Sequence, residues 1–422
     1  MRRLKISETS RGDGIRPEVR ELVRCAVHHF LNDGYSWSLY PLLPLIAAEF
    51  GLSYGGSGAI KMVFNALLSA TSIPFGILAE RVGELLVLTL GTTAFALGIS
   101  LLALAPSYPI LLGTAFLAGA GGGASHPVGS SLVSRTAPGE KMNSYIAILN
   151  VAGDVGKAVL PALAGLFALL FGWRAALMIL GLPGVALALG LSRWGSRRQQ
   201  TRGDASPEGP PGERSAGHRR ETAASGSSPG WGVRNWVQFG SLNAVGILDS
   251  LARSGVIVFA AFLLADKGFS TGVIGGLLSL TAVGGAFGKF FCGPLGDRFG
   301  GRAAVISTEI LTVAFIVLFV VSRGYWIPPI LFLLGSFLNG TSSVLYAMVP
   351  RMTTEQGRSR GFGIYYTTTL ATSGLAPLLV GLLGDVIGLY PTYYIVAGVL
   401  LLTIPLTYLA IPREEDGDGV WA

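Results

Sequence analysis

The sequence predicts an all-α membrane protein with twelve transmembrane helices in two pseudo-symmetric bundles of six. Half of its 422 residues are hydrophobic and 13% are charged, whereas about 25% of the residues of a typical soluble protein are charged. The mean hydropathy is +0.57, and the apolar runs are long enough to cross about 30 Å of hydrocarbon. The second half of the chain also repeats motifs of the first half.

Twelve apolar segments are predicted to span the bilayer. They lie at about 23–48, 57–79, 84–105, 109–133, 143–170, 174–192, 236–264, 272–295, 302–321, 327–350, 361–386 and 390–411. The polar first 22 residues are not followed by a short apolar run with a small-residue cleavage site. The first span is therefore predicted to act as an uncleaved anchor.

Lys and Arg are distributed unevenly between the two sets of loops. The tails, the central loop and the other loops on their side hold 24, and the opposite loops hold Arg174, Lys267 and Arg323. Because cytoplasmic loops are rich in basic residues, both termini are predicted to face the cytoplasm. The protein is predicted to lie in the plasma membrane, which in a bacterium is the inner membrane. This distribution also accounts for the net charge of +7, so we expect no nucleic acid as a partner.

The predicted organisation follows from the spans. A cytoplasmic tail at 1–22 precedes a six-helix bundle at 23–192, and a second bundle at 236–411 precedes a cytoplasmic tail at 412–422. The segment 193–235 is rich in Gly, Ser, Pro, Arg and Glu and has almost no aliphatic residues. Since it cannot bury enough surface to fold alone, we predict a flexible cytoplasmic linker.

Several motifs recur at a nearly constant offset along the chain. The motif GILAERVG from Gly76 matches GPLGDRFG from Gly293, and Asp33 matches Asp249 at almost the same separation. Parallel repeats of this kind predict a substrate site near the bilayer midplane, between the two bundles.

The repeated pattern G-x-L-x-D/E-R-x-G resembles the signature loop of the major facilitator superfamily, and the resemblance covers the whole chain. HFLNDGY from His29, GAGGGASHP from Gly119 and NVAGDVGKAVLP from Asn150 resemble the fosmidomycin-resistance type within it. This resemblance implies proton-driven efflux of drug-like molecules. We expect a monomer in the lipid bilayer, a small-molecule substrate, protons and no cofactor.

The chain departs from that family pattern at three places. Val128 follows His126-Pro127 where the family has an acidic residue, and Ser125 stands where Phe is usual. The fourth-span arginine of many drug–proton antiporters is absent, since Thr114 and Ala115 lie in that region.

The signature loops are predicted to gate the transporter by bridging helix ends, with glycines permitting tight turns. The alternative is a basic loop with incidental acids. The predicted gating residues are Gly76, Glu80, Arg81, Gly83, Gly293, Asp297, Arg298, Gly300 and Arg302.

Ionisable residues inside spans predict function, because they are costly in lipid and usually face a cavity or a partner. His29 and Asp33 are four residues apart, on one helical face, and could relay a proton. The alternative is a structural pair bonded to a neighbouring helix. In the fifth span, Asp154 and Lys157 could neutralise each other, or Lys157 could attract an anion. We name Asp33, His29 and Asp154 as candidates for proton coupling.

Substrate contacts are predicted from both halves. Arg253 suits a carboxylate or a phosphonate, because its planar fork binds two oxygens. His126, next to a helix-breaking proline, could line the cavity or serve helix packing. The full set of substrate-binding candidates is Arg253, Lys157, His126, Asn32, Tyr365 and Tyr346. Lys61 is predicted to reach the membrane surface along its own aliphatic stem, and Lys289 to pair with an acid near the signature loop.

No enzyme or ATP-driven pump is expected, because the sequence has no phosphate-binding P-loop and no metal-ligand spacing. Proton-coupled export of a small anionic or drug-like compound is the favoured interpretation. Uptake of an organic anion and a membrane sensor without transport activity are the alternatives.

Overall fold

The computed structural model describes residues 16–136, 142–187, 232–354 and 357–411. Within these ranges the chain is almost entirely helical, and the β-type pairing is an isolated bridge between Val233 and Thr353. Most of the predicted linker and tails lies outside the described residues.

Helices of the first half run from the N-terminal tail to the central linker. They are α1 (Pro17–Ser38), the 3-10 turn η1 (Tyr40–Leu42), α2 (Leu43–Phe50), α3 (Tyr54–Val82), α4 (Glu84–Leu102), α5 (Tyr108–Gly122), α6 (Ser125–Thr136), α7 (Met142–Phe171) and the helix Trp173–Leu187.

The second half has the same character. Its elements are α9 (Trp236–Asp266), α10 (Thr271–Phe299), α11 (Gly301–Val321), η3 (Gly324–Trp326), α12 (Ile327–Met348), η4 (Val349–Met352), α13 (Arg358–Ile387), α14 (Leu389–Leu400) and α15 (Thr403–Ala410).

Every predicted span has a helical counterpart. In the described ranges, nine helical segments are long and apolar enough to cross a membrane by themselves. The three other predicted spans correspond to α1 with α2, α5 with α6, and the shorter helix Trp173–Leu187. The break after α1 falls at Pro41 and Pro44, whose rings lack the backbone N–H that a continuous helix requires.

The internal repeat is visible in the helix boundaries. Helices α3 and α10 both have 29 residues, and helices α7 and α13 both have 30 residues. The two pairs begin at nearly the same offset along the chain. Gly83 and Gly300 end α3 and α10 with φ of 103° and 82°, a conformation that glycine adopts without steric cost. Each signature loop thus turns at its second glycine, whereas Gly76 and Gly293 lie inside α3 and α10.

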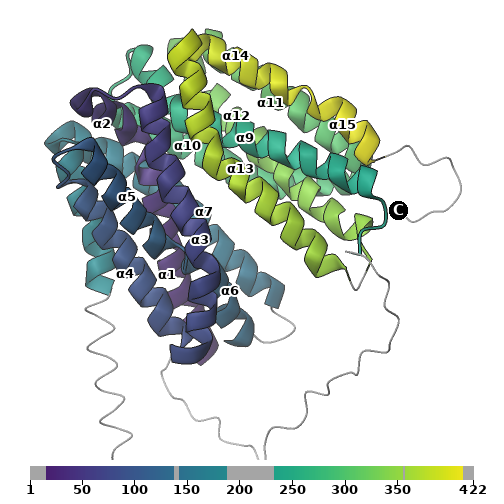
Figure 1. The fold of residues 1–422 in the computed structure, drawn as a ribbon, viewed down its shortest axis with the longest axis horizontal. Helices are drawn as coiled ribbons and strands as arrows, with labels where there is room; N and C mark the ends of the chain where they lie inside the picture. The colour runs from purple at the N-terminus through teal and green to yellow at the C-terminus, as the bar shows by residue number, and fades with distance from the viewer. Residues whose placement is uncertain (1–15, 137–141, 188–231, 355–356, 412–422) are drawn as a thin grey trace, which may run out of the picture.

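The two halves lie side by side and are in close contact at one end (Figure 1). A Cβ at Gly58 of α3 would lie 2.1 Å from the carbonyl oxygen of Pro377 in α13, and one at Gly275 of α10 would lie 2.4 Å from that of Pro161 in α7. We call this the closed end. It holds the start of α3 and α10 and the end of α7 and α13.

Toward the opposite end the helices of the two halves separate (Figure 1). In the described part of the chain, a Cβ built at Gly76 of α3 or at Gly363 of α13 would have no atom of another helix within 4 Å. We call this the open end, and it carries both signature loops.

Within the first half, glycines also set the distance between helices. A Cβ at Gly119 of α5 would lie 2.2 Å from the carbonyl oxygen of Phe64 in α3, and one at Gly156 of α7 would lie 2.1 Å from that of Phe30 in α1. These backbones touch because no side chain separates them, as expected for helix association in lipid.

We expect Gly119→Leu to destabilise the first half by about 3 kcal/mol, because the new side chain must push α5 away from α3. Gly113→Leu is the matched control on the same helix, since nothing lies within 4 Å of a Cβ there. Thermal unfolding of the purified variants in detergent measures the difference. Equal melting temperatures for the two variants would contradict the packing described above.

Candidate functional site

Helix α1 presents a buried polar face to the interior of the first half. His29, Asn32 and Asp33 expose 4%, 3% and 6% of their surface. The neighbouring helix α7 has Gly153 opposite this face, where a Cβ would lie 2.1 Å from His29 Cδ2. The glycine spacing of α7 thus lets α1 bring an imidazole and a carboxylate against its backbone.

Four alternating charges connect the two halves. Lys157 Nζ lies 2.8 Å from Asp33 Oδ2 and 3.2 Å from Asp154 Oδ1. Lys289 Nζ of α10 lies 3.0 Å from Asp154 Oδ1 and 3.1 Å from Asp154 Oδ2. We call this chain of contacts, Asp33–Lys157–Asp154–Lys289, the charge ladder. It runs from α1 through α7 to α10 and so crosses the interface between the halves.

The charge ladder corrects the expectation for Lys289 and bears on both alternatives for Asp154 and Lys157. Lys289 does not pair near its own signature loop; its carboxylate partner is Asp154 of the other half. Asp154 and Lys157 contact each other, as expected if the two charges neutralise each other. Lys157 also lines both cavities described below.

Two imidazoles contact the same carboxylate as Lys157. His29 Nε2 lies 3.4 Å from Asp33 Oδ2, and His126 Nε2 lies 3.5 Å from Asp33 Oδ1. The ring centroids of the two histidines are 4.9 Å apart. One atom from each of His29, Asp33 and His126 falls within a 4.8 Å group that could hold a metal ion. The Lys157 ammonium already neutralises this carboxylate, so we assign no metal here.

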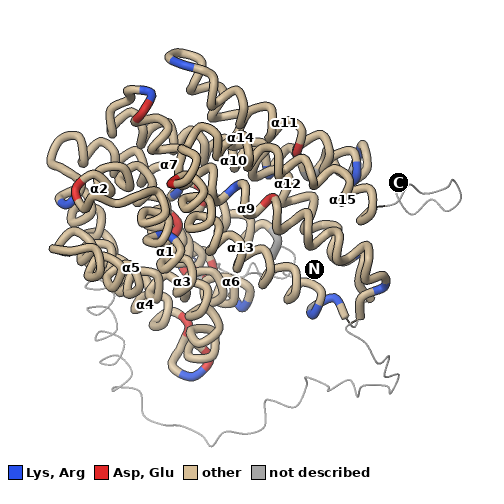
Figure 2. The backbone as a smooth tube through the Cα atoms, turned by 45° about the horizontal axis from the view of Figure 1, so that its top comes forward, with Lys and Arg blue, Asp and Glu red and all other residues tan. Residues whose placement is uncertain are grey.

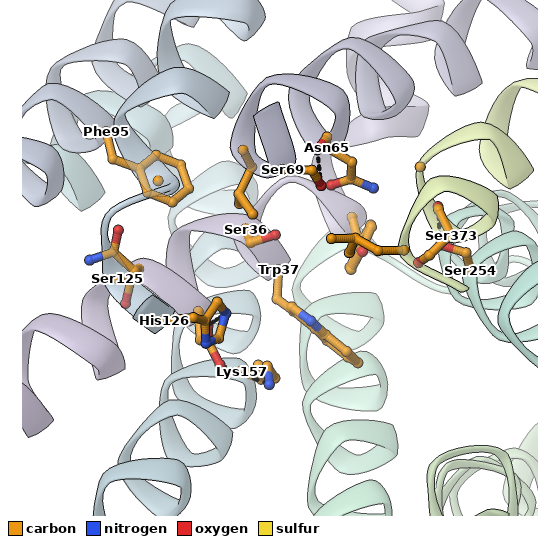
Figure 3. A pocket seen from close by; sticks show the side chains of 17 residues that line it. Ser36, Trp37, Asn65, Ser69, Phe95, Ser125, His126, Lys157, Ser254 and Ser373 are labelled. Atoms are coloured by element: carbon orange, nitrogen blue, oxygen red, sulfur yellow. Dashed lines mark hydrogen bonds and ion pairs between the residues drawn. The ribbon is translucent and has the colours of Figure 1, made fainter. Parts of the chain in front are cut away.

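A cavity of about 200 Å³ lies beside this cluster, between the two halves. Figure 3 shows His126 and Lys157 on one side, Ser254 and Ser373 of the second half on the other, and Trp37 between them. The side chain of His126 is 58% exposed, so it reaches the cavity, whereas Asp33 lines the wall with little exposure.

A second cavity of about 360 Å³ continues from the first and shares Trp37 and Lys157 with it. Its charged lining residues are Asp154, Lys157, Arg253 and Lys289. Three cations and one carboxylate therefore face this space. Figure 2 shows charged positions within the helical body near α1, α7 and α9.

The cationic residue of α9 is held by its own helix. Arg253 Nη2 lies 3.3 Å from Asp249 Oδ2, one turn earlier, and donates a hydrogen bond of 3.2 Å to Ser250 Oγ. The side chain of Arg253 is 21% exposed and lines the second cavity, whereas that of Asp249 is 4% exposed. Arg253 thus keeps part of its guanidinium available to the cavity.

The tyrosines of the second half occupy different positions. Tyr346 lines the second cavity and stacks on Tyr366, with ring centroids 5.0 Å apart. Tyr365 is 2% exposed and lies behind Tyr346, at 5.5 Å between ring centroids. It belongs to the lining of neither cavity, unlike Asn32, which lines the first.

Glu309 and His28 are buried residues with ionisable side chains that were not singled out from the sequence. Glu309 of α11 is 1% exposed, and neither of its carboxylate oxygens has a hydrogen-bond partner in the described part of the chain. A lone acid within the apolar run 302–321 was the available signal. His28, adjacent to the predicted His29, forms a 2.9 Å hydrogen bond with Thr92 Oγ1 of α4, and no sequence pattern indicated that partner.

Lys61 corrects the expectation that it reaches the membrane surface. It is fully buried, donates a 3.0 Å hydrogen bond to the carbonyl oxygen of Ser36, and lies over the rings of Tyr40 and Phe64. Ser36 is in the last turn of α1, so this ammonium satisfies a carbonyl at the negative end of a helix.

The signature-loop residues make contacts within their own halves. Glu84 Oε1 lies 3.3 Å from Arg135 Nε and accepts a 2.5 Å hydrogen bond from Ser131. Arg302 Nε donates a 2.6 Å hydrogen bond to the carbonyl oxygen of Ile411. The side chain of Asp297 lies outside the described part of the structure.

Comparison with known proteins agrees with this architecture. The family model of the Major Facilitator Superfamily matches residues 26–240 and 242–420. The fosmidomycin resistance protein of Escherichia coli is 26% identical over 403 residues, with 93% of each chain covered. YfnC of Bacillus subtilis, an uncharacterised transporter of the same superfamily, is 24% identical over 409 residues, covering 91% of this chain and 92% of the relative.

A shorter match and a solved structure complete the comparison. The multidrug resistance protein MdtG of Serratia proteamaculans is 31% identical over 144 residues, about a third of either chain. A bacterial homologue of the human lysosomal transporter Spinster, in an inward-facing, unoccupied conformation, superposes with a TM-score of 0.76 at 17% identity, over 94% of this chain and 98% of that one. The predicted fold is thereby confirmed. With both bundles matched by the family model, the chain belongs to the major facilitator superfamily of membrane transporters.

Proposed function

We propose that this protein is a proton-coupled secondary transporter that exports a small anionic or drug-like compound by alternating access. The observation that carries the proposal is the charge ladder, which joins the His29–Asp33–His126 cluster to the second half along the wall of the cavities between them. Such intramembrane charges are typical of substrate and proton pathways.

Export is favoured over uptake by the names of the relatives. One is named a fosmidomycin resistance protein and another a multidrug resistance protein, and export of a drug from the cell is a direct way to give resistance to it. The three cations that line the second cavity support an anionic group on the substrate. The cavities themselves favour transport over a purely sensory role.

The orientation follows from the basic residues. The Lys and Arg at the helix ends lie mostly at the open end, whereas Arg174, Lys267 and Arg323 are at the closed end. The rule that cytoplasmic loops are basic then makes the open end cytoplasmic and the structure inward-open. In this inward-open conformation the two signature loops are apart, and they would approach each other when the cytoplasmic side closes.

The coupling that we propose centres on Asp33. Its carboxylate is neutralised by Lys157, and the same ammonium has a second partner in Asp154. If Lys157 turns fully to Asp154, ionised Asp33 loses its cation in a buried site, which is costly unless the carboxylate takes up a proton. Lys157 can therefore alternate between two partners while Asp33 alternates between ionised and protonated forms.

Export by proton exchange requires that the substrate and the proton exclude each other at Asp33. A substrate whose anionic group is at Arg253 and whose hydrogen-bond donor is at Asp33 meets this requirement, because the donor needs the ionised carboxylate. An anion that instead draws Lys157 away from Asp33 would favour protonation, and substrate and proton would then move together, as in uptake. Proton release on substrate binding indicates the first scheme, and proton uptake the second.

Asp33→Asn is expected to abolish accumulation driven by a pH gradient while sparing passive counterflow of substrate. The measurement uses proteoliposomes and a labelled compound from a thermal-shift screen of anions and drugs, with fosmidomycin included. Asp249→Asn, at the equivalent place in the second half, is the matched control and should alter affinity without removing coupling. An Asp33→Asn protein that still concentrates the compound with unchanged pH dependence would rule out this proton site.

Arg253→Lys is expected to weaken binding of an anionic substrate about tenfold, because a point charge replaces the planar fork that binds two oxygens. Equilibrium binding of the labelled compound to purified protein measures the change. A neutral analogue of the compound provides the control and should bind both proteins alike. Equal affinity for the anionic compound would exclude Arg253 as its anchor.

The proposed orientation predicts that a tag inserted between residues 200 and 225 reacts only from the cytoplasmic side. Intact cells and inverted membrane vesicles, treated with the same membrane-impermeant reagent, provide the comparison. Labelling in intact cells would reverse the assignment of the open end.

A further inference from the structure

One carboxylate at the closed end joins the two halves through backbone amides. Asp385, in the last turn of α13, accepts hydrogen bonds of 2.7 Å from Tyr54 N–H and 3.0 Å from Gly55 N–H. Tyr54 and Gly55 are the first residues of α3, so their N–H groups have no acceptor within that helix. A carboxylate is also favoured there by the partial positive charge of a helix N-terminus.

Close backbone packing brings the carboxylate into place. A Cβ at Gly55 would lie 2.7 Å from Asp385 Oδ2, and one at Gly381 would lie 2.5 Å from the carbonyl oxygen of Tyr54. One turn further along α3, Gly58 contacts the backbone of Pro377. Any larger side chain at these glycines would move Asp385 away from the amides that it contacts.

Comparison with the pseudo-symmetric interface between α7 and α10 distinguishes the role of the carboxylate from that of the backbone packing. There a Cβ at Gly165 would lie 2.5 Å from the carbonyl oxygen of Thr271, as Gly381 meets Tyr54. The residue at the place of Asp385 is Leu169, whose Cδ2 lies 3.0 Å from a Cβ at Gly272. The backbone contact is thus made without any carboxylate, and Asp385 is not required for the helices to pack.

We propose that Asp385 is a latch that holds the closed end shut and must release the α3 amides each time the transporter opens at that end. The proposal rests on the alternating access proposed above, because only a cycle that separates α3 from α13 breaks these bonds. It concerns one conformational equilibrium of the free protein and needs no particular substrate.

The latch is reversible because its partners are accessible once it opens. The Tyr54 N–H already lies at an exposed site, so water can replace Asp385 as its acceptor. Ser53 Oγ accepts a 3.2 Å hydrogen bond from Gly56 N–H, within the first half, and this cap remains when α13 leaves. Helix α3 therefore keeps its N-terminal cap in both states, and the bonds from Asp385 supply the difference between them.

The test measures the closed-end distance without substrate. Spin labels at Pro106 of the first half and Tyr325 of the second, on a background lacking Cys25 and Cys292, report the separation by pulsed electron resonance. We expect Asp385→Ala to raise about tenfold the ratio of molecules whose halves are separated at the closed end to molecules whose halves are in contact there. The loss of charge-assisted hydrogen bonds implies a shift of this size. Asp385→Asn, which keeps an acceptor but no charge, should give a smaller shift in the same direction.

Asp266→Asn is the matched control. Asp266 lies at the same end of the same half and accepts a 2.7 Å hydrogen bond from Tyr390 within that half, so Asp266→Asn removes an acidic charge there without removing a hydrogen bond to the α3 amides. Leu169→Asp tests the reverse change, since it places a carboxylate over the start of α10. It should lower the fraction of molecules whose halves are separated at the closed end.

Distance distributions for Asp385→Ala that match the parent or the Asp266→Asn control would overturn the latch. Because no substrate is present, that result would leave the proposed transport function standing. Conversely, a shift in the distances without measurable transport of any compound would support the latch and contradict the proposed function.

Discussion

This structure depends on contacts between a glycine of one helix and a backbone carbonyl oxygen of another helix, which are possible because glycine has no side chain. It recurs within the first half, where Gly156 meets Phe30, within the second, where a Cβ at Gly284 would lie 2.0 Å from the carbonyl oxygen of Phe332, and between halves, where Gly58 meets Pro377. In lipid the hydrophobic effect does not join helices, so close van der Waals packing must do so. The same approach of backbones brings Asp33 within reach of Lys157, and so the position of the charges follows from the position of the glycines.

The two halves use equivalent carboxylates differently. Asp33 and Asp249 occupy matching places, but the cation of Asp33 comes from another helix, whereas that of Asp249 comes from the next turn of its own helix. A pair within one helix keeps its geometry when helices move. A pair between helices changes with their separation, and Lys157 has a second acceptor to receive it. The first half thus holds the exchangeable charges and the second half the fixed one, in a fold whose backbone is nearly symmetrical.

The helices and their repeat could be predicted from the sequence, because length, hydropathy and glycine spacing act along the chain. The ionisable residues of the first and second cavities could also be identified as single positions, since each interrupts an apolar run. Their partners could not. Periodicity places Lys289 on a face of α10 but does not say that Asp154 of the other half is opposite. It also does not reveal that the Lys61 ammonium is buried against the ring of Tyr40. Glu309 is a single acid within the apolar run 302–321, but unlike Asp33, Asp154 and Asp249 it has no histidine or basic residue within four positions to suggest a partner.

The equal lengths of the repeated helices restrict which sequence changes the packing tolerates. Each residue added to an α-helix turns everything beyond it by about 100°, so an insertion within α3 or α10 would carry Gly58 or Gly275 away from the backbone that each one touches. Both helices have 29 residues, and α7 and α13 both have 30. Positions within each pair of helices therefore correspond one to one, as Leu169 does to Asp385. A substitution at such a position changes one contact, whereas an insertion would displace every contact beyond it.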